Sequence, residues 1–324
     1  MGTAIVNYSV NNEPGSHWGI QRGSEVFPIR QQFADHRQLL DCYFNDRAAF
    51  DAQVEGQGIA ADSLTYEAPV ARDIQLFCQG LNYASHRAES GVDADDHEEN
   101  LLFMKAASSI CGPNDTILRP RGCQLLDYEI ELGLVLKRDL APATTVSEGD
   151  LGQYIGGLVL CNDVSARDLM FGAPMLQWFR GKSQRTFCPM GPVLYLVDEA
   201  DVARLYSLEL KLWMNGELKQ DAVTDQLIHR PAKTLTEIAD FSAMAKGDCL
   251  LTGTPGGILG GASLKVALAI LLNFTNDGKR REKFTRAQLA RTRFLAPGDV
   301  LELQIRTPDG AIDLGRQRNE IEEA

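Results

Sequence analysis

The stretch DYEIELGLVL, residues 127–136, alternates with the two-residue period that is typical of a β-strand. One face is expected to carry Tyr128, Ile130, Leu132, Leu134 and Leu136, and the other Asp127, Glu129, Glu131, Gly133 and Val135. Glu129 and Glu131 then project from the same face, with their Cα atoms about 7 Å apart. Two carboxylates at that distance repel each other unless water or a cation lies between them.

Two interpretations of this acidic face are open. In the first, the face is solvated, because glutamate usually meets water. In the second, Glu129 and Glu131 bind a hard cation such as Mg²⁺ or Mn²⁺, which takes oxygen ligands and keeps positions open for substrate and water. A third carboxylate would come from Asp163, which ends the apolar run YIGGLVLCNDV (154–164) and could be aimed by the sheet behind it. The alternative for Asp163 is an Asx-turn or a helix N-cap.

Composition limits the class of protein. The 324 residues, 44% of them hydrophobic, can bury a large core, and a net charge of −12 argues against a nucleic-acid partner. Seven scattered cysteines without a CxxC motif indicate reduced thiols in a cytoplasmic protein. The N-terminus carries no pattern of a secretory signal, and the longest apolar run, 266–274, is too short to span a membrane and predicts a buried helix.

The chain is expected to form two domains. Residues 1–70 predict a small N-terminal domain with strands near 3–10 and 24–30 and a helix over 36–56. Residues 71–324 predict a β-rich region, with a hairpin at Asn215-Gly216 and a helix over 234–244 that opens with a Thr234-x-x-Glu237 capping box. No G-x-G-x-x-G or P-loop occurs, so the pattern favours a β-rich α+β fold over a doubly wound one.

Three further segments carry polar side chains that suit catalysis. GLNYASHRAESG (80–91) places His86 and Glu89 at i and i+3 of a short helix, as a general base pair or as a surface salt bridge. The acidic run that follows, 90–100, is expected to form a lid. Lys182, in a segment that otherwise predicts a basic surface loop, could meet an anionic substrate. The tight loop LTGTPGG (251–257) suits a carboxylate or an oxyanion, or is an ordinary turn.

Taken in their order along the chain, several segments of this sequence resemble the fumarylacetoacetate hydrolase family. The resemblance covers about residues 74–257 and resumes at 294–303. It rests on GLNYASH, LLFMKAASSICGPNDTI, DYEIELGLVL, NDVSARDL, QWFRGKSQRTFCPMGP, LWMNGELKQD and LTGTPGG. It implies a mixed β-roll catalytic domain, a smaller N-terminal α/β domain and a homodimer. A departure is the segment 258–293, which predicts an inserted helical pair with a Thr285-x-x-Gln288 cap, placed over the pocket mouth or at an interface.

The resemblance also implies the site. Mg²⁺, or Mn²⁺ or Ca²⁺, would be held by Glu129, Glu131 and Asp163. The catalytic residues would be His86, Glu89 and Lys182, and the substrate-binding residues Tyr83, Arg167, Gln177 and Thr254.

The expected activity is metal-dependent hydrolysis of a C–C bond in an acylpyruvate-type 2-oxo acid, giving pyruvate and a carboxylic acid through an enolate stabilised at the metal. The alternatives are an isomerase or an oxaloacetate-type decarboxylase that uses the same site. A non-enzymatic scaffold on this fold is the third possibility, and the intact set of site residues argues against it.

Overall fold

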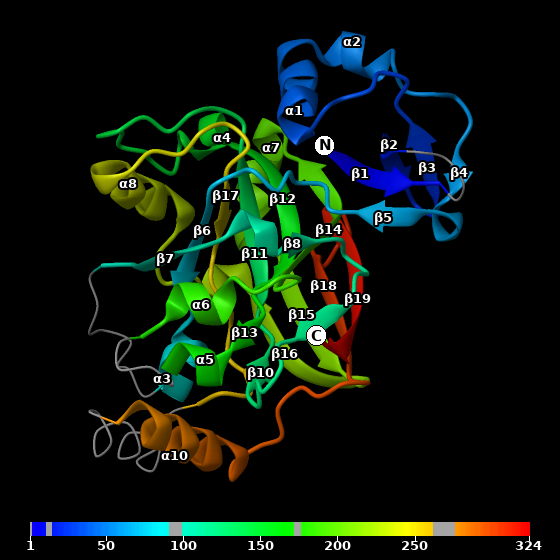
Figure 1. The fold of residues 1–324 in the computed structure, drawn as a ribbon. Coiled ribbons are helices and arrows are strands. Elements are labelled where there is room, and N and C mark those ends of the chain that lie inside the picture. The colour runs from blue at the N-terminus through cyan, green and yellow to red at the C-terminus, as the bar shows by residue number, and fades with distance from the viewer. Residues whose placement is uncertain (1, 11–14, 91–98, 172–175, 262–275) are drawn as a thin grey trace.

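The computed structural model describes residues 2–10, 15–90, 99–171, 176–261 and 276–324, and shows a β-rich α+β fold (Figure 1). Its main sheet of 12 strands contains the order β4-β3-β2-β1-β14-β12-β11-β17-β6-β7, with β5 paired to β1 and β8 paired to β14. The strands of that sheet are β1 (Thr3–Ser9), β2 (His17–Arg22), β3 (Glu25–Pro28), β4 (Ile59–Ala60), β5 (Thr65–Glu67), β6 (Leu76–Gly80), β7 (Leu101–Lys105), β8 (Ile110–Cys111), β11 (Ile130–Leu136), β12 (Ile155–Asn162), β14 (Cys188–Leu196) and β17 (Cys249–Leu251).

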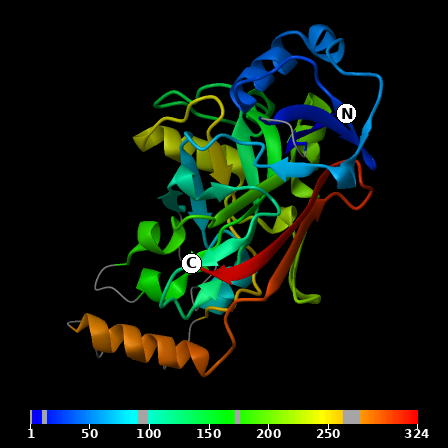
Figure 2. The same cartoon turned by 45° about the vertical axis from the view of Figure 1, so that its right-hand side comes forward.

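A second sheet of five strands has the order β16-β15-β18-β19-β9 and contacts β11, β12 and β14 of the main sheet (Figures 1 and 2). Its strands are β9 (Ile117–Arg119), β15 (Glu209–Met214), β16 (Glu217–Val223), β18 (Val300–Arg306) and β19 (Asp313–Glu323), and a small ladder joins β10 (Leu126–Asp127) to β13 (Ser165–Ala166). The predicted hairpin at Asn215-Gly216 is confirmed, since it joins β15 to β16.

The central strand is β11, which pairs with β12 on one side and β17 on the other. All seven of its residues are buried, as expected of a strand covered on both faces. Leu132 and Leu134 belong to one apolar core, whereas Val135 belongs to a second core on the opposite face. The interpretation of Glu129 and Glu131 as a solvated face is therefore wrong, because the face that carries them lies inside the protein.

The N-terminal residues extend the main sheet, because β1 pairs antiparallel with β14. The helix predicted over 36–56 is instead two helices, α1 (His36–Asn45) and α2 (Arg47–Asp51). Asp46 separates them: it ends α1 and caps α2, where its side chain accepts a hydrogen bond from the Ala49 N–H at 2.9 Å. The two-domain division near residue 70 stays a prediction.

The other α-helices of the described residues are α3 (Ala84–Ser90), α4 (Leu151–Tyr154), α5 (Arg167–Phe171), α6 (Trp178–Lys182), α7 (Glu199–Val202), α8 (Pro231–Phe241) and α10 (Asp277–Leu289). Both predicted threonine caps are wrong. Thr234 lies inside α8, which begins at Pro231, a residue well suited to the first turn. Thr285 lies inside α10, where the Asn276 side chain accepts from the Lys279 N–H at 3.0 Å.

The predicted buried helix at 266–274, the first half of the inserted pair, lies outside the described residues, and so does most of the expected lid.

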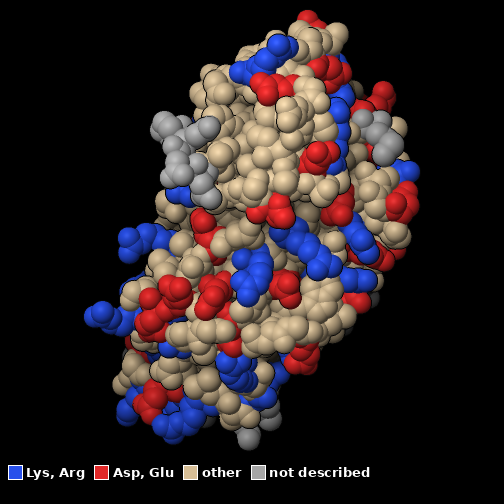
Figure 3. Space-filling view, turned by 90° about the vertical axis from the view of Figure 1, so that its right-hand side faces the viewer, with Lys and Arg blue, Asp and Glu red and all other residues tan. Residues whose placement is uncertain are grey.

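Within the described ranges, no helix is long and apolar enough to cross a membrane. All seven cysteines are described, and none forms a disulfide. The face in Figure 3 carries acidic and basic side chains side by side, the pattern of an ordinary solvated surface.

His36 joins the N-terminal helices to the main sheet. Its ring is fully buried, with Nε2 2.9 Å from the Gly247 carbonyl oxygen and Nδ1 3.2 Å from the Ala71 amide nitrogen. A neutral ring with its proton on Nε2 donates to Gly247 and accepts from Ala71, and a second proton would disrupt the Ala71 bond. Burial lowers the pKa of His36, although Gly247 partly opposes that shift.

We expect this histidine to make stability depend on pH. Because its pKa is lower in the folded state, its contribution is present above the unfolded pKa of about 6.5 and is lost as the pH falls below it. Urea unfolding between about pH 7.5 and 5.5 should show a steeper loss of unfolding free energy for the wild type than for His36→Gln. Equal slopes for the two proteins would contradict the prediction.

Candidate metal and active site

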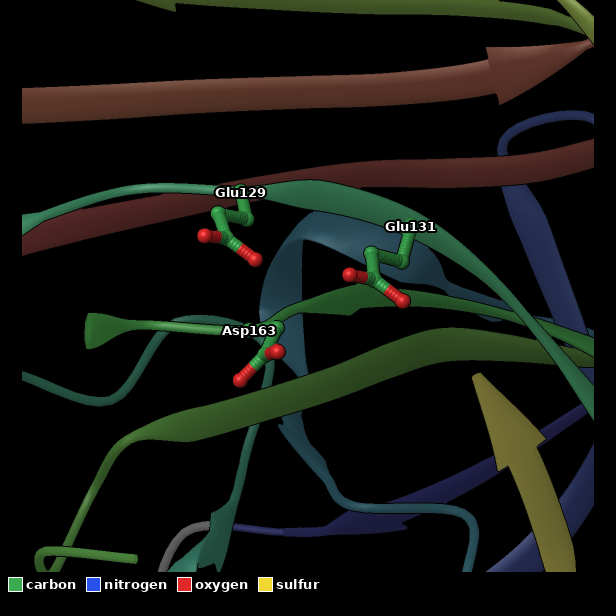
Figure 4. Close-up of side chains that lie close together, drawn as sticks. All are labelled: Glu129, Glu131 and Asp163. Atoms are coloured by element: carbon green, nitrogen blue, oxygen red, sulfur yellow. The ribbon is translucent and has the colours of Figure 1, made fainter. Parts of the chain in front are cut away.

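Three carboxylates converge where β11 meets β12. Glu129 immediately precedes β11, Glu131 lies within it, and Asp163 immediately follows β12. The antiparallel register places Ile130 opposite Asn162, and the Asp163 N–H donates to the Glu129 carbonyl oxygen at 2.8 Å. One ligand atom from each side chain lies within 4.8 Å of the other two, and Figure 4 shows the side chains pointing toward one another. All three are almost completely buried, with exposed fractions of 4%, 1% and 0%.

Two lysines approach these carboxylates from other elements. Lys182, the last residue of α6, places Nζ 2.7 Å from Glu129 Oε2 and 2.6 Å from Asp163 Oδ2. Lys105, the last residue of β7, places Nζ 2.5 Å from Asp163 Oδ1. The sequence interpretation gave Lys105 no role. The sequence feature that could have indicated a role for Lys105 is its position as a single cation at the end of the apolar run LLFM, in a segment that resembles the family.

Arg167 and Asp127 form the outer side of the cluster. The Arg167 guanidinium donates to Glu129 Oε1, and its Nε donates to Asp127 Oδ2 at 2.9 Å. Asp127 also accepts from the N–H groups of Leu259 and Gly260 at 3.0 and 2.9 Å. It therefore fixes both the arginine and the loop that follows the Gly-Thr-Pro turn. The expected substrate-binding residue Arg167 is committed to two carboxylates, and the anchoring role of Asp127 was missed.

The electrostatics of the carboxylates suit a divalent cation. Burial, together with the charges of Asp163 and Glu129, raises the pKa of Glu131 well above its ordinary value. Burial alone would also raise the pKa of Glu129, but Lys182 and Arg167 outweigh it and lower that pKa. A cation at the convergence point would offset the repulsion that Glu131 experiences. Because the donors are all carboxylate oxygens, the residues fit a hard ion such as Mg²⁺, Mn²⁺ or Ca²⁺.

The buried polar atoms that lack a hydrogen-bond partner among the described residues include His86 Nδ1 and the Tyr83 hydroxyl. Burial lowers the pKa of His86 to about 4, against the opposing charge of Glu129. Burial and the charge of Glu131 raise the pKa of Tyr83. Near neutral pH, His86 is therefore an uncharged imidazole and Tyr83 an intact phenol. Both have hydrogen-bonding capacity to offer a ligand.

His86 and Glu89 both lie on α3, but the structure does not pair them as expected. The Glu89 carboxylate instead accepts from the Gly257 N–H, at 2.9 and 3.0 Å to its two oxygens. Spacing along α3 therefore places the two residues near each other without joining them, because the backbone of a distant loop binds Glu89.

The other expected substrate-binding residues differ in their positions. Thr254 is buried, and its hydroxyl accepts from Gln220 Nε2 at 2.8 Å. Gln220 in turn accepts from the Ile130 N–H at 3.0 Å, which ties the Gly-Thr-Pro loop to the start of β11. Gln177 is exposed at the N-terminal end of α6. Its role in substrate binding stays a prediction.

The fold and the site together define a β-rich α+β protein whose buried carboxylates fit a divalent cation. Residues 75–322 match the family model described as fumarylacetoacetate (FAA) hydrolase C-terminal. The chain therefore belongs to the fumarylacetoacetate hydrolase family, a family of enzymes, and the resemblance drawn from the sequence is confirmed.

The similar proteins carry more than one activity in their names. "Oxaloacetate tautomerase FAHD2B, mitochondrial" of Bos taurus is 36% identical over 195 residues, a match that spans 60% of this chain and 60% of that protein. "2,4-Didehydro-3-deoxy-L-rhamnonate hydrolase" of Sphingomonas sp. (strain SKA58) is 31% identical over 278 residues, covering 85% and 83%. A probable 2-hydroxyhepta-2,4-diene-1,7-dioate isomerase from Mycobacterium abscessus superposes with a TM-score of 0.72 at 26% identity, covering 100% and 99%.

Asp127→Asn is expected to weaken the outer side of the cluster. The amide keeps the size of the side chain but loses the charge that binds Arg167 and two backbone N–H groups. We expect the unfolding free energy to fall by about 1.5–3 kcal/mol, the range for hydrogen bonds to charged groups. Urea unfolding measures this change, with Asp221→Asn, an exposed position in β16, as the control. Equal losses for the two variants would contradict an anchoring role.

Proposed function

We propose that this protein is a metal-dependent hydrolase that cleaves a C–C bond of an acylpyruvate-type 2-oxo acid, releasing pyruvate and a carboxylic acid. The observation that carries the proposal is the convergence of Glu129, Glu131 and Asp163 on one point, with the Lys182 ammonium bound to two of them. A bound divalent ion would supply a Lewis acid for the oxygens of the 2-oxo acid group.

The side chains of the chain then have separate tasks. Burial alone would lower the pKa of Lys182, but Asp163 and Glu129 raise it, so this residue keeps its positive charge. A charged ammonium next to the reacting group stabilises the enolate that C–C cleavage leaves behind. His86 is a neutral imidazole that can accept a proton from water as the water oxygen attacks the distal carbonyl. The Tyr83 hydroxyl is free to orient the substrate by donating to one of its oxygens.

A tautomerase or isomerase is the second candidate. It is supported by the bovine tautomerase relative and by the position of Glu89, which binds Gly257 and leaves His86 without a carboxylate partner. Moving a proton between carbon and oxygen needs the same anion stabilisation but no activated water. The greater coverage of the Sphingomonas hydrolase favours hydrolysis.

A substrate panel tests the proposal. The purified protein is given Mg²⁺ and, in separate assays, acylpyruvates, fumarylpyruvate, maleylpyruvate, fumarylacetoacetate and oxaloacetate. Loss of enol absorbance together with equimolar pyruvate and carboxylic acid from an acylpyruvate, or acetoacetate and fumarate from fumarylacetoacetate, indicates hydrolysis. Pyruvate and CO₂ from oxaloacetate indicate decarboxylation. Loss of enol absorbance without cleavage products indicates tautomerisation and would overturn the hydrolase assignment.

Glu131→Gln should remove most of the Mg²⁺ affinity and the activity. The amide keeps the hydrogen-bond acceptor for the Gly253 N–H but removes one of the three negative charges. Calorimetric titration with Mg²⁺ measures the affinity, and Glu217→Gln, in an exposed part of the β15–β16 hairpin, is the matched control. Full activity of Glu131→Gln in excess chelator would end the metal assignment.

His86→Ala separates the two candidate activities. Without the imidazole, hydrolysis should slow by about 10²–10⁴-fold, the usual contribution of a general base. Tautomerisation or decarboxylation of oxaloacetate should fall much less if it does not use an activated water. Rates on an acylpyruvate and on oxaloacetate, each measured with saturating Mg²⁺, distinguish the two activities. His17→Ala in β2 is the control. Unchanged hydrolysis in His86→Ala would remove this residue from the mechanism.

A further inference from the structure

Each of the three converging carboxylates has one oxygen bound by a group of the protein that approaches from a different segment. Glu129 Oε1 accepts from Arg167, and Asp163 Oδ1 accepts from Lys105. Glu131 Oε2 accepts from the Gly253 N–H at 2.8 Å. The second oxygens are Glu129 Oε2, Glu131 Oε1 and Asp163 Oδ2, and an ion that binds all three would displace the Lys182 ammonium from two of them. Lys182 contacts the first and last of these.

Lys105 is a fixed member of this arrangement. Its side chain is fully buried, and its ammonium lies near three acceptors, which matches its three N–H donors. These are Asp163 Oδ1 at 2.5 Å, the Phe187 carbonyl oxygen at 3.0 Å and the Val164 carbonyl oxygen at 3.4 Å. Two of the three acceptors are backbone carbonyls, which stay in place when an ion binds. Lys105 therefore has a permanent site, from which it holds one oxygen of Asp163.

Gly253 is equally constrained. Its φ of +92° lies in the left-handed region, and a Cβ atom at this position would lie 2.9 Å from the Asn82 side chain. Only glycine adopts this conformation without strain, and it is the conformation in which the amide donates to Glu131. The backbone thus holds one oxygen of Glu131, as Lys105 holds one oxygen of Asp163.

We propose that Lys105 is a positioning residue that limits Asp163 to a single metal-binding oxygen, and that Arg167 and Gly253 do the same for Glu129 and Glu131. Three single-oxygen carboxylates suit a small six-coordinate ion, Mg²⁺ or Mn²⁺, which keeps other positions for water or substrate. Ca²⁺ takes six to eight oxygens and can bind both oxygens of a carboxylate to reach the higher coordination numbers. The site therefore selects Mg²⁺ or Mn²⁺ over Ca²⁺. This inference rests on the proposed metal site.

The test is a calorimetric titration of the full chain with MgCl₂, MnCl₂ and CaCl₂, in the absence of substrate. The wild type should bind Mg²⁺ or Mn²⁺ more tightly than Ca²⁺. Lys105→Met releases Asp163 Oδ1, so the affinity for Ca²⁺ relative to Mg²⁺ should rise by about 10-fold or more, the scale of effects from groups that orient metal ligands. Lys105→Arg, which restores a cationic donor, should return the ratio toward the wild-type value.

Lys137→Met is the matched control, because it removes a half-buried lysine that lies over the Phe44 ring away from the carboxylates. It should leave the ion preference unchanged. If Lys105→Met does not fold, as circular dichroism would show, Lys105→Leu takes its place, since it also removes the N–H donor to Asp163 Oδ1. The wild-type preference is a test in any case, and tighter binding of Ca²⁺ than of Mg²⁺ and Mn²⁺ would overturn the inference.

The possible failures are distinct. A wild type that binds no divalent ion overturns the metal site itself, and the selectivity with it. A folded Lys105→Met or Lys105→Leu protein with the wild-type ratio of Ca²⁺ to Mg²⁺ affinity overturns the role of Lys105 alone. In that case Lys105 only neutralises buried charge.

Discussion

The structure depends on the pairing of charges in the protein interior. Six ionisable side chains form one connected network of hydrogen bonds and ion pairs: Asp127, Glu129, Asp163, Lys105, Arg167 and Lys182. Glu131 lies beside this network, with a carboxylate oxygen within 4.8 Å of ligand oxygens of Glu129 and Asp163. An unpaired charge in the protein interior destabilises the folded state by several kcal/mol, which is comparable to the whole unfolding free energy of a small protein. Each carboxylate must therefore find a cation, a donor or a bound ion. This requirement draws together segments that are far apart in the sequence.

The apolar core supplies the rigidity that this network needs. Strand β11 is buried on both faces and held between β12 and β17, so the ends of its neighbours have little freedom. The carboxylates stand where β11 begins and β12 ends, with the lysines at the ends of β7 and α6. Apolar residues in these places would often give a more stable protein. Charge retained at such a cost is expected where a site must bind or transform a charged ligand.

The parts of the site that the sequence predicted are those carried by local pattern. The alternation in 127–136 identified the strand and the pair Glu129 and Glu131, and the end of an apolar run identified Asp163. The burial of that face could not be predicted, since it depends on cations contributed by Lys105, Arg167 and Lys182 at distant positions. A lone lysine at the end of a short strand, such as Lys105, usually indicates a solvated edge.

The helix errors have a similar origin. The Thr-x-x-Glu and Thr-x-x-Gln patterns at Thr234 and Thr285 are compatible with a capping box, but each occurs in the middle of a helix. Pro231, three residues before Thr234, and Asn276, nine residues before Thr285, are the stronger start signals. The i, i+3 spacing of His86 and Glu89 was correct as helical geometry and wrong as a contact, because spacing on one helix says nothing of the Gly257 amide that arrives from another part of the chain.

The Gly257 amide belongs to a loop that bears on whether the site favours hydrolysis or tautomerisation. Gly253 and Gly257 both lie in the segment after β17, and their N–H groups bind Glu131 and Glu89 respectively. The same loop thus orients the Glu131 carboxylate and binds Glu89, the acid that was expected to pair with His86. A hydrolase in which Glu89 orients His86 requires the Glu89 carboxylate to leave the Gly257 N–H. A tautomerase has no such requirement, because its anion is stabilised by the cationic groups already in place.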